Sequence, residues 1–144
     1  MLWTLSMALS LSVACASKKV TLPMADIQVG QKVISVELAD DPAERHQGLM
    51  YRSDMDAEHG MLFVYPDTAP RSFWMENTAI PLSIAFLDET GRVLNIEDMT
   101  PYDRSGVPSA GAAMYALEMN RGWFERNGVQ VGSVIAGLPG PSEN

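Results

Sequence analysis

The sequence predicts a small, strand-rich α+β domain, in which a twisted, partly barrel-like and mostly antiparallel sheet carries two short helices. Three observations support this fold class. Apolar residues alternate along several short segments, as in half-buried strands. Turn residues separate these segments at short intervals, and only two stretches carry helix start and stop signals. A chain of 144 residues, with 47% hydrophobic and 19% charged residues, fits one such domain.

The N-terminus predicts export. Residues 2–16 are uncharged and mostly apolar; they are too short to span a membrane but suit a signal peptide, so we assign residues 1–16 to an export signal. Cys15, the only cysteine, stands at the signal boundary. It would be either the acylated first residue of a lipoprotein or part of a cleavage site that releases a free periplasmic protein. An uncleaved anchor is a third alternative. In each case we expect the protein to contact the membrane only through this segment or the lipid attached to it.

The remaining chain divides into three parts. Residues 17–30 contain Pro23 and Gly30 and lack periodicity, which indicates a linker. Residues 31–136 form the globular domain, and the composition of residues 137–144 indicates a disordered tail.

The first elements of the domain are a strand and a helix. Residues 33–38 alternate, so that Ile34 and Val36 share a face. A short helix follows, because Asp41 can cap it, Glu44 stands at the capping-box position and Gly48 can end it in a left-handed conformation.

Strands dominate the middle of the chain. The apolar runs 61–65 and 71–75 predict two strands that Pro66 keeps apart. Residues 82–87 and 92–99 flank a four-residue connection that contains Gly91, which indicates a β-hairpin.

The C-terminal third begins with a long loop. Residues 100–113 are rich in proline, glycine and serine, and long loops in compact domains are often functional. Residues 114–119 predict the next strand. Asn120 then caps a short helix that includes Trp123 and ends at Gly128, and residues 131–135 form a final strand.

Charge and motifs exclude several functions. The formal net charge is −8, from 10 basic and 18 acidic residues, so we expect no nucleic-acid partner, because phosphate binding needs a basic face. The chain carries no phosphate-binding loop, dinucleotide fingerprint, zinc-protease motif or serine-hydrolase elbow. His46 and His59 are interpreted as solvent-facing histidines. We expect a monomer without a cofactor.

The segment 71–78 is the densest candidate ligand site. Arg71 could bind a carboxylate or phosphate, Trp74 could stack on a ring, and Asn77 could donate or accept hydrogen bonds. The alternative is structural: the apolar side chains belong to the core, Arg71 pairs with a carboxylate, and Asn77 lies in a turn. A ligand site would also include Tyr102 from the predicted loop, together with Glu118 and Trp123.

Glu118 is an acid inside an apolar strand. A lone buried carboxylate is costly, so an inward-facing Glu118 must be paired or protonated. Its expected partner is Arg71. A structural ion pair and a site carboxylate are equal alternatives, and an outward-facing Glu118 would be neither.

Ten methionines are many for this length. Exported thioethers could bind copper(I), which prefers soft ligands. Flexible methionines also fill gaps in cores, and the absence of paired methionine motifs favours that interpretation.

Several ordered motifs are similar to the family called domain of unknown function 192. This resemblance spans about residues 33–134 and implies a compact, strand-rich domain, often exported, without an established activity. The motifs are residues 39–45, 48–50, 60–63, 71–78, 80–82, 115–118 and 122–123.

Three functional hypotheses remain. The first is a non-catalytic accessory module of the cell envelope that binds a small polar ligand or a protein segment, with residues 100–113 as its rim. The second is a hydrolase or lyase that uses Glu118 with Tyr102 or Asp103. The third is a methionine-based copper(I) binder.

Overall fold

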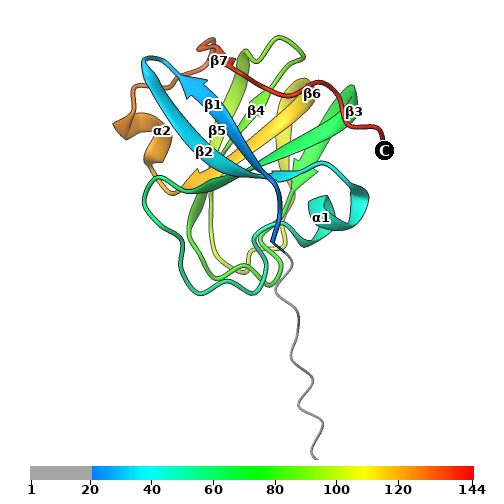
Figure 1. The fold of residues 1–144 in the computed structure, drawn as a ribbon. Helices are drawn as coiled ribbons and strands as arrows, with labels where there is room; N and C mark the ends of the chain where they lie inside the picture. Colours follow the sequence, from blue (N-terminus) through cyan, green and yellow to red (C-terminus); the bar gives the residue numbers. More distant parts are fainter. Residues whose placement is uncertain (1–20) are drawn as a thin grey trace, which may run out of the picture.

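A single curved sheet organises the protein, which is described here from a computed structural model covering residues 21–144 (Figure 1). The predicted export signal, Cys15 and the start of the predicted linker lie outside these residues. Within residues 21–144, no helix has the length and apolar character needed to cross a membrane. The elements are β1 Met24–Val29, β2 Lys32–Ala39, α1 Pro42–Gln47, β3 Gly60–Phe73, β4 Leu82–Leu87, β5 Val93–Met99, β6 Val107–Asn120, α2 Trp123–Arg126 and β7 Ile135–Ala136.

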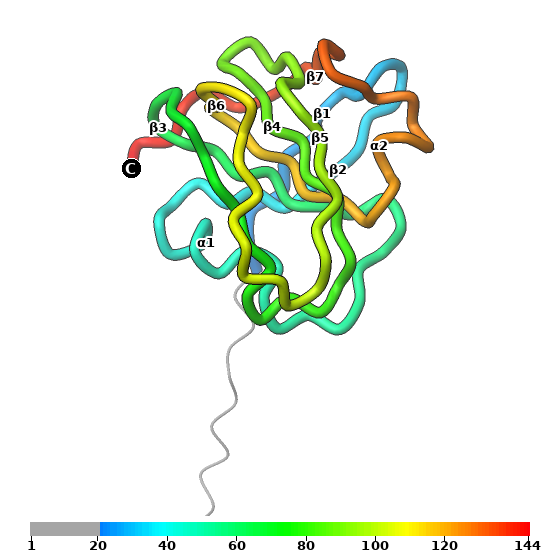
Figure 2. The backbone as a smooth tube through the Cα atoms, turned by 180° about the vertical axis from the view of Figure 1, so that it is seen from behind, coloured from blue at the N-terminus to red at the C-terminus, as the bar shows by residue number. Residues whose placement is uncertain are grey.

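The predicted fold class is confirmed. The seven strands form one sheet in the order β5-β4-β6-β3-β2-β1-β7. Only β2 and β3 pair in parallel, and the other neighbours are antiparallel. Strands β3 and β6 run side by side through the middle of the molecule and bend together, which curls the sheet into a half-barrel (Figure 2).

The linker prediction is wrong from Met24 onward. Residues 24–29 form β1, which pairs with β2 in a tight hairpin. Ile27 and Val29 alternate with polar residues and are buried. The alternating pattern contains only Ala25, Ile27 and Val29. Because it is this short and lies between Pro23 and Gly30, the sequence was interpreted as a linker.

Strands β3 and β6 are both longer than predicted. The two strands expected at 61–65 and 71–75 are one strand, because the ladder shifts register between Val64 and Ala69 and so bypasses the missing N–H of Pro66. The loop expected at 100–113 ends at Gly106. From Val107 on, the chain is strand β6, whose first half pairs with the end of β3.

The first helix forms as predicted and the second differs at its start. Asp41 and Glu44 make the reciprocal capping box of α1, and the backbone turns at Gly48 with a φ of 48°. Helix α2 starts after Gly122, not from a cap at Asn120. The Asn120 side chain donates instead to the Asp56 carbonyl at 2.8 Å, which holds the loop before β3.

The C-terminal tail is not disordered as its composition predicts. The hydroxyl of Tyr115 donates to the Pro139 carbonyl at 2.7 Å, and a guanidinium nitrogen of Arg45 donates to the Asn144 carbonyl at 2.8 Å. Leu138 packs against the core. The predicted strand at 131–135 is reduced to β7, a two-residue pairing with β1.

Two hydrophobic cores cover the two faces of the sheet. Strand β4 is buried on both sides: Ala85 and Leu87 face the first core, whereas Ile84 and Phe86 face the second. Four methionines are at most 1% exposed, which confirms for them the core-filling interpretation: Met61, Met75, Met99 and Met119.

Candidate functional site

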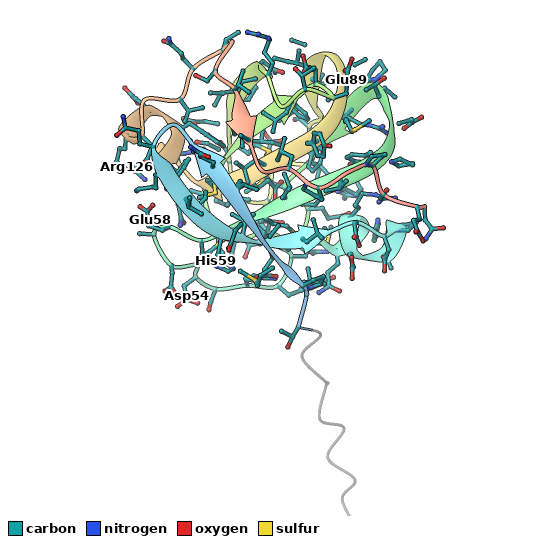
Figure 3. The ribbon with its side chains drawn as sticks, turned by 45° about the horizontal axis from the view of Figure 1, so that its top comes forward. Asp54, Glu58, His59, Glu89 and Arg126 are labelled. Carbon is teal, nitrogen blue, oxygen red and sulfur yellow. The ribbon has the colours of Figure 1, made fainter. Side chains whose placement is uncertain are left out.

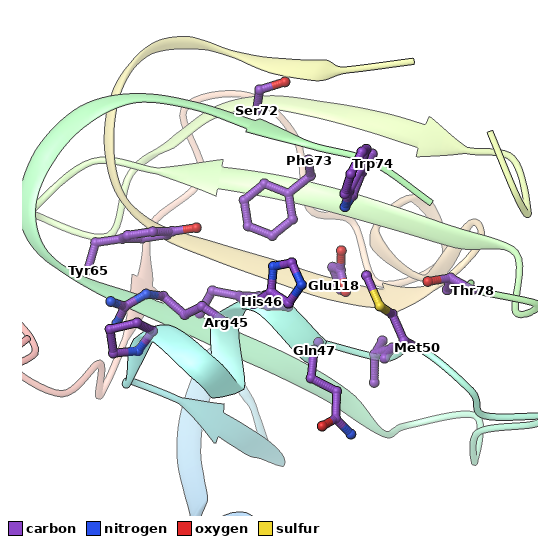
Figure 4. A pocket seen from close by; sticks show the side chains of 14 residues that line it. Arg45, His46, Gln47, Met50, Tyr65, Ser72, Phe73, Trp74, Thr78 and Glu118 are labelled. Carbon is purple, nitrogen blue, oxygen red and sulfur yellow. The ribbon is translucent and has the colours of Figure 1, made fainter. Parts of the chain in front are cut away.

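A cavity of about 420 Å³ opens on the face of the sheet that carries the second core. Helix α1 and the residues after it form one wall, and β3 with the residue that follows it forms the other (Figure 4). Small-molecule sites commonly have this size and a largely apolar lining. The lining residues are Pro42, Arg45, His46, Gln47, Gly48, Leu49, Met50, Phe63, Tyr65, Ser72, Phe73, Trp74, Thr78 and Glu118.

Glu118 supplies the acid of this cavity. Its strand neighbours on either side are Met61 of β3 and Ile84 of β4, both core residues. The residue is 4% exposed, and burial raises the pKa of its carboxyl from 4.5 to about 8. Glu118 is therefore mostly protonated at neutral pH, so it can donate a hydrogen bond and can also ionise when a cation approaches.

No group among residues 21–144 forms a hydrogen bond or ion pair with the Glu118 side chain. The predicted pair with Arg71 is wrong. Arg71 instead bonds the Asp67 carboxylate at 2.6 Å and the Ala113 carbonyl at 3.1 Å. The register shift in β3 explains the difference, because it turns Arg71 toward Asp67 and away from the cavity floor.

Tyr65, a wall residue of the cavity, packs against two guanidinium groups. The guanidinium carbon of Arg71 lies 3.8 Å from the centre of its ring and that of Arg45 lies 5.0 Å away. Such stacking fixes the ring. Burial nevertheless raises the pKa of the Tyr65 phenol, against the opposing influence of both cations. Tyr65 is thus a neutral wall residue at physiological pH.

Helix α1 is held against β3 by specific contacts. Arg45 donates to the carbonyls of Asp40 at 2.7 Å and Val64 at 2.9 Å. At the helix end, a Cβ on Gly48 would lie 3.3 Å from the Phe63 ring. A glycine is needed here both for the positive φ and for this close approach. The wall that carries His46 and Met50 is therefore fixed in place.

Of the predicted site residues, the structure brings Trp74 and Glu118 to one cavity. Trp74 is 41% exposed and stands at the rim. Asn77 has a φ of 51° and its amide donates to the Tyr51 hydroxyl at 3.1 Å, which is the turn role of the structural alternative. Tyr102 is exposed and lines no part of the cavity, and Trp123 is buried in the other core.

The predicted rim does not border the cavity either. Residues 100–106 are absent from its lining, and so is Asp103, the second acid of the enzymatic hypothesis. The sequence did not indicate that the aromatic rings of Phe63, Tyr65 and Phe73 line a cavity. His46 was expected only to face solvent. His46 is exposed, yet it faces the cavity (Figure 4).

A second polar cluster lies outside this cavity. The guanidinium of Arg52 makes two hydrogen bonds of 2.6 Å to the carboxylate of Glu37. His59, expected to face solvent, contacts the same carboxylate at 2.8 Å and is only partly exposed. These contacts, led by the Arg52 hydrogen bonds, lower the pKa of Glu37 to about 2. The cluster ties β2 to the loop before β3, where Figure 3 labels His59 beside Asp54 and Glu58.

Replacing Arg52 with alanine should destabilise the domain more at neutral than at acidic pH. A lowered folded pKa stabilises the fold above the ordinary value of 4.5, and this contribution is lost as pH falls toward about 2. The full shift corresponds to about 3 kcal/mol. Because water reaches the pair, we expect about 1 to 2 kcal/mol at neutral pH. Urea unfolding at several pH values measures this.

Lys32→Ala is the matched control for this prediction. It breaks the exposed pair between Lys32 and Glu58, which should contribute little because water screens both charges. Equal losses for the two variants, or a loss for Arg52→Ala that does not shrink on acidification, would contradict the assigned role of Glu37.

Aromatic rings line much of the cavity, and the described residues contain no cluster of metal ligands. Among residues 21–144, no three histidine, cysteine, aspartate or glutamate side chains gather in a way that could hold a metal. The cavity instead combines one acid with four aromatic rings, from Phe63, Tyr65, Phe73 and Trp74.

Comparison with known proteins identifies the family. The model of the domain of unknown function 192 family, described as "Uncharacterized ACR, COG1430", matches residues 25–137. The chain belongs to this family. No curated protein matches the chain.

Two solved structures are similar to this member of the domain of unknown function 192 family. One is a Sinorhizobium meliloti protein described as a candidate transcription regulator; it is 35% identical, with a TM-score of 0.79 over 83% of this chain and 98% of its own. The other is a Novosphingobium aromaticivorans protein of unknown function; it is 37% identical, with a TM-score of 0.73 over 90% of this chain and 94% of its own.

The segments that carry the family resemblance converge on the cavity. Gly48, Leu49 and Met50 come from one motif, Phe73 and Trp74 from a second, and Glu118 from a third. These motifs are far apart in the sequence, and the fold gathers them on one face. The signal that could have located the site was therefore the set of motifs taken together.

Proposed function

We propose that this domain is a binding module that holds a small ligand in the cavity above Glu118. One observation carries the proposal: Glu118 is a residue only 4% exposed, yet its side chain opens into a cavity and has no hydrogen-bond partner among the described residues. A ligand in the cavity could form hydrogen bonds with this carboxyl, and such a polar group in an otherwise apolar site fixes a ligand's orientation.

The surroundings of Glu118 support a ligand with an apolar or aromatic body. Phe63 and Phe73 meet edge to face with ring centres 4.9 Å apart, and Phe73 meets Phe86 in the same way at 5.6 Å. This packing holds the inner wall rigid. Trp74 adds an exposed indole at the rim, on which a ligand ring can stack.

Catalysis has less support than binding. The enzymatic hypothesis needs a second group beside Glu118, and neither Tyr102 nor Asp103 lines the cavity. The predicted export signal, with its two alternatives for Cys15, stays a prediction from the sequence. The envelope location is accordingly part of the proposal.

A ligand screen by NMR tests the binding function, with the indole N–H signals of Trp74 and Trp123 as reporters. Because Trp74 lines the cavity and Trp123 lies in the other core, a true ligand should shift the first signal and leave the second unchanged. Glu118→Gln should weaken binding at least tenfold, which corresponds to about 1.4 kcal/mol.

Glu89→Gln is the matched control, because it removes one exposed carboxylate on the β4–β5 turn, outside the cavity lining. Its affinity should equal that of the parent. The proposal fails if no compound shifts the Trp74 signal, or if Glu118→Gln binds every hit as tightly as the parent.

A further inference from the structure

Among residues 21–144, Glu118 has no counter-charge, and the fold explains why. The charged or titratable groups that face it are Arg45 and His46 from α1 and Tyr65 from β3. From the strands beside it, β3 and β4 present Met61 and Ile84. None of the cations of residues 21–144 comes within ion-pair distance of its carboxyl. A cation at this position must therefore come from outside the described chain.

Neither nearby guanidinium is available to turn inward. Arg45 already donates to two carbonyls of its own wall and to Asn144. Arg71 is held by Asp67 and by the Ala113 carbonyl on the far side of Tyr65. Turning either one toward Glu118 would leave carbonyl groups without their donors, which is unfavourable. The bonds of Arg45 and Arg71 therefore hold both guanidinium groups away from the Glu118 carboxyl.

The walls around this position suit a cation. The faces of aromatic rings are negative and attract ammonium groups. In Figure 4, Phe73 and Trp74 lie above Glu118, and His46 and Met50 flank it to the left and right. A protonated amine matches these surroundings, because its N–H groups can donate charge-assisted hydrogen bonds to the carboxylate oxygens while its positive charge meets the ring faces.

We propose that the ligand of this cavity is an organic amine, whose ammonium group pairs with the Glu118 carboxylate while its apolar body lies between Phe73, Trp74 and Met50. This inference rests on the binding function proposed above and names the chemical class of the ligand. A neutral ligand that accepts a hydrogen bond from protonated Glu118 is the competing class.

The two classes have opposite pH dependence. An amine binds the ionised carboxylate, and because burial holds the pKa of Glu118 at about 8, the site must first release its proton. The affinity for an amine should rise about tenfold per pH unit below 8 and level off above it. A neutral acceptor needs the protonated form, so its affinity should be constant below pH 8 and fall above it.

Benzylamine and benzyl alcohol are probes of nearly equal shape. They differ in that the amino group of benzylamine is positively charged, whereas the hydroxyl of benzyl alcohol is neutral. Calorimetric titration at pH values of about 6, 7 and 8 should show benzylamine binding about ninefold tighter at the first step and about fivefold tighter at the second, with release of about one proton at the two lower values. Proton release is measured by repeating each titration in buffers of different ionisation enthalpy. At pH 8 benzyl alcohol should bind more weakly than benzylamine. Its affinity should not rise with pH.

Two variants assign the pH slope to its residue. His46 also lines the cavity, so its contribution is tested separately. His46→Gln is expected to change the affinity for benzylamine but to keep its slope and its proton release. Glu118→Gln should abolish both, and Glu89→Gln should behave as the parent.

The outcomes separate this inference from the binding function. If benzyl alcohol or another neutral compound shifts Trp74 and benzylamine does not bind, the amine class is wrong and the binding function stands. If benzylamine binds without a pH slope, or with a slope that Glu118→Gln retains, the ion pair with Glu118 is wrong. If no compound of either class binds, both proposals fail.

Discussion

Glu118→Gln is expected to stabilise the domain at alkaline pH and to remove the pH dependence of stability that this carboxyl produces between pH 4.5 and about 8. Burial raises the pKa of Glu118 from 4.5 to about 8, so between these values the folded carboxyl is protonated whereas the unfolded one is ionised. A raised folded pKa gives a contribution that is complete below 4.5 and is lost as pH rises to about 8. Each pH unit costs about 1.4 kcal/mol, or at most about 5 kcal/mol in all.

Urea unfolding at pH values of about 5, 6.5 and 8 measures this effect. At the lowest pH the glutamate and the glutamine are both neutral in the fold, so the two proteins should have similar free energies of unfolding. The advantage of the variant should then grow at each step. Glu89→Gln should follow the parent curve, because Glu89 is exposed on the β4–β5 turn. Parallel curves for parent and Glu118→Gln would show that the carboxyl is not held protonated.

Local signals explain which elements could be predicted. The hairpin of β4 and β5 and the capped helix α1 depend on residues within a few positions of each other, and both form as expected. The lengths of β3 and β6 depend on pairing between segments far apart in the chain. Pro66 suggested that the strand ends there, but the register shift between Val64 and Ala69 accommodates the proline within one strand. No local sequence pattern shows which strand will pair with this segment.

The same distinction applies to the site. Glu118 could be singled out because an acid in an apolar strand needs a special explanation. Its partner could not be predicted, because the direction of Arg71 depends on the register shift in β3. The cavity also needs Phe63 and Tyr65, whose apolar run indicates only a buried strand. Their role appears when α1 packs against them through Gly48 and Arg45.

Gly60→Ala is expected to cost about 3 kcal/mol, because overpacking a rigid site destabilises by that order. Gly60 begins β3 opposite Met119. An added Cβ would lie inside van der Waals distance of the Met119 sulfur and of the Glu118 carbonyl oxygen. The thioether can move, but the carbonyl belongs to the backbone of the central strand, so β6 itself must shift at the residue that serves the cavity.

The glycine at position 111 provides the control, because a Cβ there meets nothing within 4 Å and its φ lies outside the left-handed region. Gly111→Ala should therefore stay within about 0.5 kcal/mol of the parent in urea unfolding. A displaced β6 should also move Glu118, so Gly60→Ala should shift the Trp74 indole signal across the cavity even in the folded protein. Equal stability of the two variants would mean that the β6 backbone moves at Glu118 at little cost in free energy. The assumption that β6 holds Glu118 rigidly in the cavity would then be wrong.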